Sequence, residues 1–274
     1  MNHRSPSVMK VVILAAGYGT RLQRDIGKDT TDDYAHLVGL PKPLVPIGSK
    51  PLISHWMKDL TEHGITGPIL VVTNDFYKDH FDSWALNWKC VHLISDSTTC
   101  NDDRIGAVAC IQLAVKKGNI DDDVLVIGGD TLFYDDFSLS DFLAAFQKRK
   151  ESHPGASMVV SNHVPCEEVV KRGILEVNDE LKVTGFLEKP NPEDTDSRRA
   201  CPCFYLFSKE SLPHLDVFLS EPRPMKEKDA TGNFVKYLYS RMPVFVYDIS
   251  GRFDVGSLED YKVCHKHFLE KEKR

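Results

Sequence analysis

The segment of this chain best suited to chemistry is a glycine-rich turn that follows an apolar run near the N-terminus. Residues 14–22 read LAAGYGTRL, and the longest apolar run of the chain spans 11–16. Gly17 and Gly19 let the backbone approach a ligand closely, and successive amides that point outward form a cradle for phosphate oxygens. Arg21 adds a guanidinium that can bind phosphate through two hydrogen bonds. The segment predicts a nucleotide-binding loop, although it has neither the third glycine of the dinucleotide fingerprint nor the ending of a Walker loop.

A second segment places one cation on a rigid arm. Residues 41–48 read PKPLVPIG, so that Lys42 lies between two prolines. Proline fixes its own φ and restricts the residue before it. The arm therefore predicts a positive charge held in a defined place.

Alternating elements in the first half of the chain would position these residues. Four apolar or β-branched runs, typical of strands buried on both faces, lie at 11–16, 69–73, 91–95 and 124–127. Three amphipathic stretches lie between them, at 51–63, 77–88 and 106–117. Repeated β-α-β units predict an α/β fold with a doubly wound, mostly parallel sheet. Asp130 follows one of these strands, at the sheet edge where such folds bind ligands.

The pattern changes after residue 150. Further strands are predicted at 158–161, 174–177, 182–187, 203–207 and 244–249, several separated by short polar turns. Helices are predicted at 233–241 and 258–271. No linker and no internal repeat divides the chain, so we expect one Rossmann-like domain over 1–274, with halves at 9–150 and 151–262, a mixed-strand second half and a C-terminal helix end at 263–274.

Composition excludes several classes of protein. The chain has 274 residues, 42% of them hydrophobic and 27% charged, with a formal net charge of -6. This composition predicts a folded protein, and scattered Lys and Arg residues argue against a nucleic-acid partner. No apolar run approaches the roughly 18 residues that a membrane span requires, so no membrane partner is expected. Residues 1–6 lack the apolar region of a secretory signal, which predicts a cytoplasmic protein.

Five motifs resemble those of the nucleoside-triphosphate:sugar-1-phosphate nucleotidyltransferases, or nucleotide-sugar pyrophosphorylases, among them short members such as glucose-1-phosphate thymidylyltransferase. The family signature LAAG-x-GTRL followed by PKPL-x-P(V/I) is similar, almost letter for letter, to residues 14–22 and 41–47. The elements GD-x-x-F, EKP and W-x-D-x-G-(T/S) resemble GDTLF at 129–133, FLEKP at 186–190 and RFDVGS at 252–257. The resemblance covers about residues 9–262 in the family order.

The resemblance implies transfer of a nucleoside monophosphate from a triphosphate, UTP or dTTP, to a sugar 1-phosphate, with release of pyrophosphate and with Mg²⁺ as cofactor. It assigns the nucleotide to the first half and the sugar phosphate to the second, and it implies a homo-oligomer. The implied catalytic residues are Arg21, Lys42 and Lys189. The implied nucleotide-binding residues are Leu14, Ala15, Ala16, Gly17, Gly19, Thr20, Asn101 and Gly106. The implied substrate-binding residues are Gly173, Glu188 and Lys189, and the implied metal ligands are Asp130 and Asp254.

Two departures from the family pattern, at Asn101 and at 201–205, leave the substrates open, and a third, the insertion at 23–40, adds a lid or an ordering loop. Asn101 stands where thymidylyl- and uridylyltransferases usually have Gln, a polar insertion spans 23–40, and CPCFY at 201–205 replaces a strand that often touches the sugar. The altered strand keeps a cytidylyltransferase for phosphocholine or a phosphonate as an alternative. A second alternative is a catalytically silent protein that binds a nucleotide sugar and regulates a partner.

Overall fold

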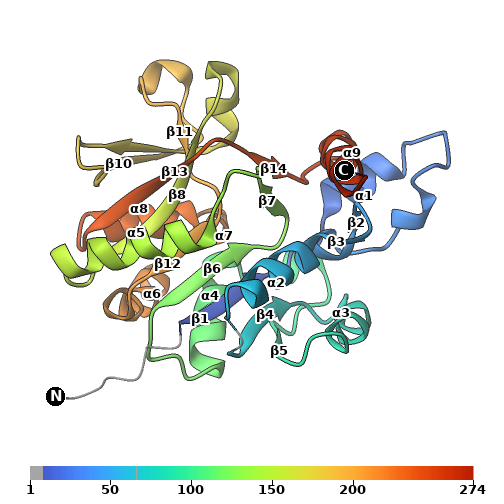
Figure 1. Ribbon diagram of the computed structural model, residues 1–274, viewed down its shortest axis with the longest axis horizontal. Coiled ribbons are helices and arrows are strands. Elements are labelled where there is room, and N and C mark those ends of the chain that lie inside the picture. The colour runs from blue at the N-terminus through green and yellow to red at the C-terminus, as the bar shows by residue number, and fades with distance from the viewer. Residues whose placement is uncertain (1–8, 66, 274) are drawn as a thin grey trace.

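A ten-stranded sheet runs through both halves of the sequence in the computed structural model, which describes residues 9–65 and 67–273 (Figure 1). Its first part is parallel, in the order β6 (Val124–Gly128), β1 (Lys10–Leu14), β4 (Ile69–Thr73) and β5 (Val91–Ser95). The predicted parallel sheet is thus confirmed. Residues 1–6, on which the argument against a secretory signal rests, lie outside the described residues.

The second half of the chain extends this sheet with strands of mixed direction. β12 (Phe204–Phe207) pairs antiparallel with β6 and with β8 (Ser157–His163), and so joins the two halves. β13 (Val244–Ile249) runs parallel to β8, while β11 (Arg199–Ala200) is antiparallel to it. β9 (Gly173–Val177) and β10 (Val183–Glu188) form the antiparallel outer edge. The predicted mixed extension is confirmed.

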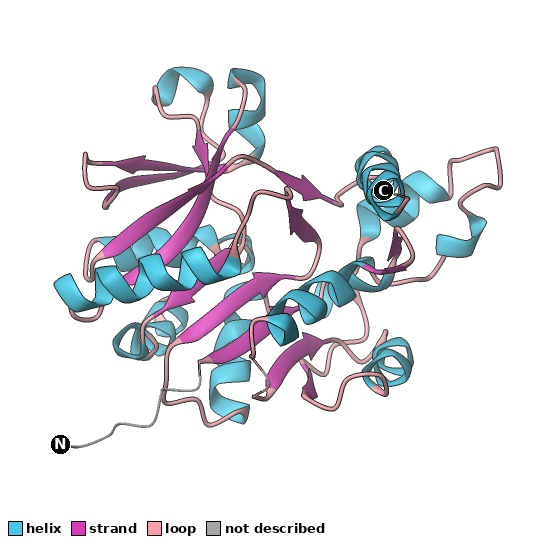
Figure 2. Cartoon of the chain, in the orientation of Figure 1, coloured by secondary structure: helices cyan, strands magenta, loops and turns pink. Residues whose placement is uncertain are grey.

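Helices cover both faces of the sheet and give three layers (Figure 2). One face carries α2 (Leu52–Glu62), α3 (Lys78–Ala85) and α5 (Leu139–Ser152), and the other carries α4 (Ala107–Lys117), α6 (Pro213–Ser220) and α8 (Gly232–Tyr239). Along β1, Val11 and Ile13 pack toward the first group and Val12 toward the second, as expected of a strand buried on both faces. Within the described part of the chain, no helix is both long and apolar enough to cross a membrane.

A second group of short elements lies beside the sheet and holds the lysine arm. β2 (Pro46–Ile47) and β3 (Lys50–Pro51) form a small ribbon against which α9 (Leu258–Glu272) packs. The ring Nδ1 of His265 in α9 lies 3.0 Å from the Pro46 carbonyl oxygen. The polar insertion begins in α1 (Thr20–Ile26), and the Gln23 side-chain amide donates to the carbonyls of Leu37 and Leu40. These hydrogen bonds tie the end of the insertion back to α1.

An aromatic cluster fastens β12 to the first half of the chain. The Phe204 ring centroid lies 4.9 Å from that of Phe133, 5.1 Å from that of Trp56 and 5.2 Å from that of Phe142. Phe204 itself is 1% exposed. Because its ring partners come from β7 (Thr131–Phe133), α2 and α5, this side chain links three elements at once.

Phe204→Ala is expected to lower the free energy of unfolding by about 3–5 kcal/mol, since it removes a buried ring and leaves a cavity. Urea denaturation followed by circular dichroism measures the change. The matched control is Phe76→Ala, because Phe76 is 61% exposed and its truncation should cost less than about 0.5 kcal/mol. Equal losses in the two variants would contradict the role given to the cluster.

Candidate active site

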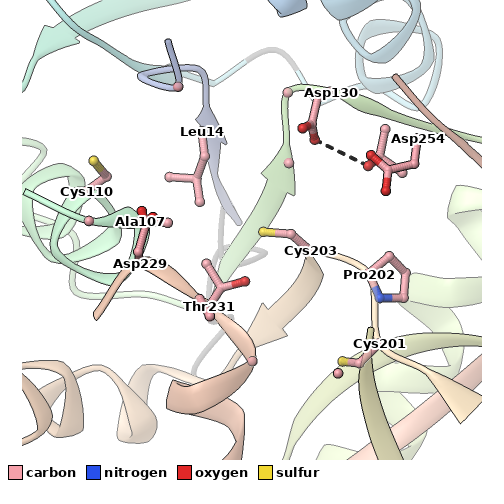
Figure 3. A pocket seen from close by; sticks show the side chains of 18 of the residues that line it. Leu14, Ala107, Cys110, Asp130, Cys201, Pro202, Cys203, Asp229, Thr231 and Asp254 are labelled. Atoms are coloured by element: carbon pink, nitrogen blue, oxygen red, sulfur yellow. Dashed lines mark hydrogen bonds between the residues drawn. The ribbon is translucent and has the colours of Figure 1, made fainter. Parts of the chain in front are cut away.

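A cavity of about 480 Å³ opens at the carboxyl ends of β1 and β6 (Figure 3). This edge is where open α/β sheets bind ligands. All five sequence motifs contribute to its wall, through Gly17, Gly19, Lys42, Asp130, Glu188, Lys189 and Asp254. Leu14, Ala15, Ala16, Gly106 and Gly173 also line it. The fold thus brings together most of the residues that the sequence singled out.

Glycines allow the loop, the lysine arm and the strand end to approach one another. Gly19 has a φ of +62°, and a Cβ placed on it would lie 3.2 Å from Cγ of Lys42. A Cβ on Gly129 would lie 2.6 Å from the Leu14 carbonyl oxygen, closer than real Cβ atoms come. The Lys42 ammonium then lies 3.5 Å from Oδ2 of Asp130. The arm therefore delivers its cation between the glycine loop and the first candidate metal ligand.

A two-stranded ribbon places the two candidate metal ligands beside each other. β7 pairs antiparallel with β14 (Arg252–Asp254), in a register that sets Asp254 opposite Thr131. The Val255 amide donates to the Asp130 carbonyl oxygen at 2.9 Å. Figure 3 shows both carboxylates at the same end of the cavity. Residues far apart in the sequence thus become a carboxylate pair through backbone pairing alone.

Two guanidinium groups surround the Asp254 carboxylate. Arg172 Nη1 donates to its Oδ2 at 2.5 Å, and Arg252 Nη1 lies 3.5 Å from the same oxygen. Burial by itself would raise the pKa of Asp254, but the two arginines outweigh it and hold the pKa below its usual range. Sequence reasoning missed both arginines, although Arg172 directly precedes Gly173 and Arg252 opens the RFDVGS motif.

The donor set around the ribbon fits a magnesium ion that arrives with phosphate. Mg²⁺ takes one or two protein carboxylates and fills its remaining positions with water and phosphate oxygens. Asp130 and Asp254 supply two carboxylates in the cavity wall. Across residues 9–65 and 67–273, no group of three or more His, Cys, Asp or Glu side chains could form a metal site from protein alone. The site therefore suits an ion shared with substrate.

The end of the cavity that the resemblance assigns to the sugar phosphate contains Glu188, Lys189 and Gly173. The Lys189 amide donates to the Arg172 carbonyl at 2.9 Å, which joins this end to the ribbon. A Cβ on Gly173 would meet the Phe186 ring at 2.5 Å and Oε2 of Glu188 at 3.1 Å, so glycine keeps this corner open. Burial raises the pKa of Glu188 against the opposing effect of nearby lysines. Burial likewise raises the pKa of Cys203 to about 12, which keeps that thiol protonated at neutral pH.

At the end of the cavity that the resemblance assigns to the nucleotide, the predicted residue Asn101 does not line the wall. Its short helical turn directs the backbone carbonyl inward, where it accepts from Arg104 Nη1 at 2.8 Å. Asp96, which directly follows β5 and is 9% exposed, lines the cavity there. Its Oδ1 accepts from the backbone N–H and the hydroxyl of Thr98. Its place at the carboxyl end of a predicted strand was the signal that could have identified it.

Thr20 and Arg21 also lie outside the cavity wall. Both are exposed in the first turn of α1. Arg21 Nη1 lies 3.4 Å from the position that a Cβ on Gly256 would take. Arg21 is therefore placed beside the segment that follows Asp254, at the rim of the site.

Comparison with known proteins agrees with this geometry. The family described as nucleotidyl transferase matches residues 10–271. The chain belongs to this family. The nucleotidyl transferase fold also appears in a solved structure described as apo UDP-glucose pyrophosphorylase, with a TM-score of 0.75, 21% identity and coverage of 96% of this chain and 99% of that one.

Two curated relatives show the range of activities named within the family. A UTP–glucose-1-phosphate uridylyltransferase of Synechocystis sp. is 24% identical over 96% of this chain, which spans 64% of that protein. A glucose-1-phosphate adenylyltransferase of Corynebacterium glutamicum is 28% identical over 96% of this chain, which spans 67% of that protein. Both names describe nucleotidyl transfer with a sugar 1-phosphate, while the nucleotides differ.

Gly17→Ala is expected to weaken nucleotide binding without affecting stability. No atom lies within 4 Å of a Cβ at this position, so folding should change by less than about 1 kcal/mol, whereas the methyl group would occupy space that phosphate needs. Isothermal titration with UTP should show a loss of affinity of about 10-fold or more. Gly27→Ala, outside the cavity, is the control. Unchanged UTP affinity in Gly17→Ala would contradict close backbone approach at this loop.

Proposed function

We propose that this protein transfers a nucleoside monophosphate from a nucleoside triphosphate to a sugar 1-phosphate and releases pyrophosphate. The observation that carries the proposal is the single cavity that gathers the glycine loop, the Lys42 cation, the carboxylate pair and Lys189. These are the groups that a reaction between two phosphate compounds requires.

The reaction proceeds by in-line attack of an acceptor phosphate oxygen on the α-phosphorus. The new P–O bond forms as the bond to the β-phosphate oxygen breaks, and pyrophosphate leaves with the bonding electron pair. Such a step needs positioning and charge neutralisation more than covalent chemistry. The loop amides and Lys42 bind the triphosphate and the leaving pyrophosphate, and Lys189 binds the acceptor phosphate. Arg21 at the rim adds positive charge for the leaving group.

Asp130 and Asp254 would hold the magnesium ion. When bound, the ion neutralises charge on the phosphates and helps to orient them. The protein's own contribution is to present the two carboxylates at one end of the cavity, beside Lys42.

The nucleobase end favours uracil or thymine, and hence UTP or dTTP. Burial raises the pKa of Asp96, and the two hydrogen bonds from Thr98 oppose that rise. As a carboxylate, Asp96 only accepts hydrogen bonds. Uracil and thymine carry an N3–H donor, whereas cytosine has an acceptor at N3. This polarity supports a pyrimidine with N3–H over the cytidylyltransferase alternative.

The acceptor end favours a sugar phosphate over phosphocholine. Lys171 and Lys189 line this end together with one carboxylate, Glu188. A quaternary ammonium group is bound by a cage of aromatic faces or by acidic side chains, and a lysine pair disfavours it. Lys42, Asp130 and Asp254 are all retained in the cavity wall, which supports an active enzyme over a silent nucleotide-sugar-binding protein.

Asp130→Asn is expected to lower the rate of pyrophosphate release from UTP and glucose 1-phosphate by about 100-fold or more, because the amide removes one anionic ligand for the metal. A coupled phosphate assay measures the rate, and circular dichroism checks the fold. Asp122→Asn, a change far from the cavity wall, is the matched control and should retain the full rate. Full activity in Asp130→Asn would contradict the assignment.

Asp96→Asn is expected to reduce kcat/KM for UTP by about 10-fold or more and to raise the ratio of CTP to UTP turnover. The physical reason is that an amide N–H can donate to N3 of cytosine, which the carboxylate repels. Steady-state rates with both nucleotides measure the shift, and Asp102→Asn on the exposed loop is the control. An unchanged ratio would contradict base recognition by Asp96.

A further inference from the structure

We infer that Arg172 is an exchangeable counter-ion of Asp254: it occupies this carboxylate in the metal-free protein and is displaced when a divalent cation binds. The inference rests on the proposed function, because it takes Asp254 as a metal ligand. It adds a competing group that neither the motifs nor the family match assigns.

The contacts of Asp254 show the competition directly. The Oδ2 oxygen of Asp254 already accepts from Arg172 Nη1 at 2.5 Å and has Arg252 Nη1 at 3.5 Å. A divalent cation that approaches this oxygen meets two positive charges at short range. Like charges at such distances interact by several kcal/mol even at the effective dielectric of a protein surface. Metal binding at Oδ2 therefore requires at least one guanidinium to move.

Arg172 is the guanidinium that can leave. Its side chain is 27% exposed and has a second carboxylate partner, since Nη2 lies 3.2 Å from Oε2 of Glu168. Its Nε is buried and has no hydrogen-bond partner among the described residues, so the present pose leaves a donor unsatisfied. When Asp254 is released, the charge of Arg172 remains paired with Glu168.

Arg252 is the guanidinium that stays. Its side chain is 10% exposed, and Nη1 also lies 3.5 Å from the hydroxyl oxygen of Thr131. It belongs to β14, whose backbone is fixed by pairing with β7. Arg252 thus holds the ribbon in both states, whereas Arg172 reaches Asp254 from a separate segment just before β9.

Such an exchange gives the site two properties. Asp254 stays ionised and oriented while no metal is bound, so the carboxylate is ready for an ion. A bare ion also binds weakly, because it must displace Arg172 without help. An ion that arrives with a triphosphate brings negative charge that offsets the guanidinium, and its entry is therefore coupled to the nucleotide.

The test measures Mn²⁺ binding to the full chain without nucleotide, by electron paramagnetic resonance of free Mn²⁺ at constant ionic strength. Arg172→Gln is expected to tighten Mn²⁺ binding by about 10-fold, a coupling of ordinary size. Glu168→Gln is the matched variant and should change Mn²⁺ affinity in the opposite direction. It leaves Asp254 as the only carboxylate partner of Arg172 and so strengthens that ion pair. Mn²⁺ binding should therefore weaken. Arg172→Lys keeps the charge without the planar fork and should fall between Arg172→Gln and the native chain.

Asp254→Asn separates failure of this inference from failure of the metal assignment. If Asp254→Asn loses Mn²⁺ binding while Arg172→Gln binds Mn²⁺ no more tightly than the native chain, the exchange is overturned and the metal site stands. If Asp254→Asn binds Mn²⁺ as well as the native chain, the metal assignment fails and the inference fails with it. Weakened binding in both Arg172→Gln and Glu168→Gln, with unchanged circular dichroism, shows a purely structural role and also overturns the exchange.

Discussion

Antiparallel pairing of β7 with β14 is the interaction on which the site depends. It sets Asp254 opposite Thr131, and the Val255 amide donates to the Asp130 carbonyl, so that both carboxylates lie at the same end of the cavity. Both strands are anchored from outside. The Trp56 indole N–H donates to the Thr131 carbonyl at 2.7 Å, and the chain leaves β14 through the capping box with which Ser257 begins α9. The core and the C-terminal helix thus determine where the two carboxylates lie.

Charge balance in the cavity follows from this placement. The protein as a whole has a formal charge of -6, yet the ribbon concentrates cations around its carboxylates. Lys42, Arg172 and Arg252 lie within 4 Å of an oxygen of Asp130 or Asp254. Positive groups held in advance of the substrate cost no rearrangement when phosphate charge develops, which is how electrostatic preorganisation assists phosphoryl transfer.

The parallel strands and the motifs can be recognised in the sequence, and the physical signal is different in each case. Strands such as β4 are buried on both faces, and their continuous apolar runs are visible without any tertiary information. The conformations of the glycine loop and of the lysine arm are set by their own residues. Glycine frees the backbone of the loop, and proline restricts the backbone of the arm. α5 was not predicted, although its buried Leu139, Phe142 and Phe146 recur at i, i+3 and i+7 behind the N-cap residue Ser138, which is the spacing of an amphipathic helix. Asp96 could have been identified from its place directly after a predicted strand. The contact of Arg172 with Asp254 joins segments 82 residues apart, and the displacement of Asn101 depends on the path of one loop, so neither spacing nor composition reveals them.

The most direct test of the account is to detect the products of one reaction by ³¹P nuclear magnetic resonance. The native protein with Mg²⁺ would be incubated with each of UTP, dTTP, CTP, ATP and GTP against glucose-, mannose-, galactose- and N-acetylglucosamine 1-phosphate and against phosphocholine. The account predicts equal amounts of pyrophosphate and of a nucleotide sugar from UTP or dTTP and one of the sugar phosphates. Formation of no product in any combination, while the protein still binds nucleotide, would contradict it.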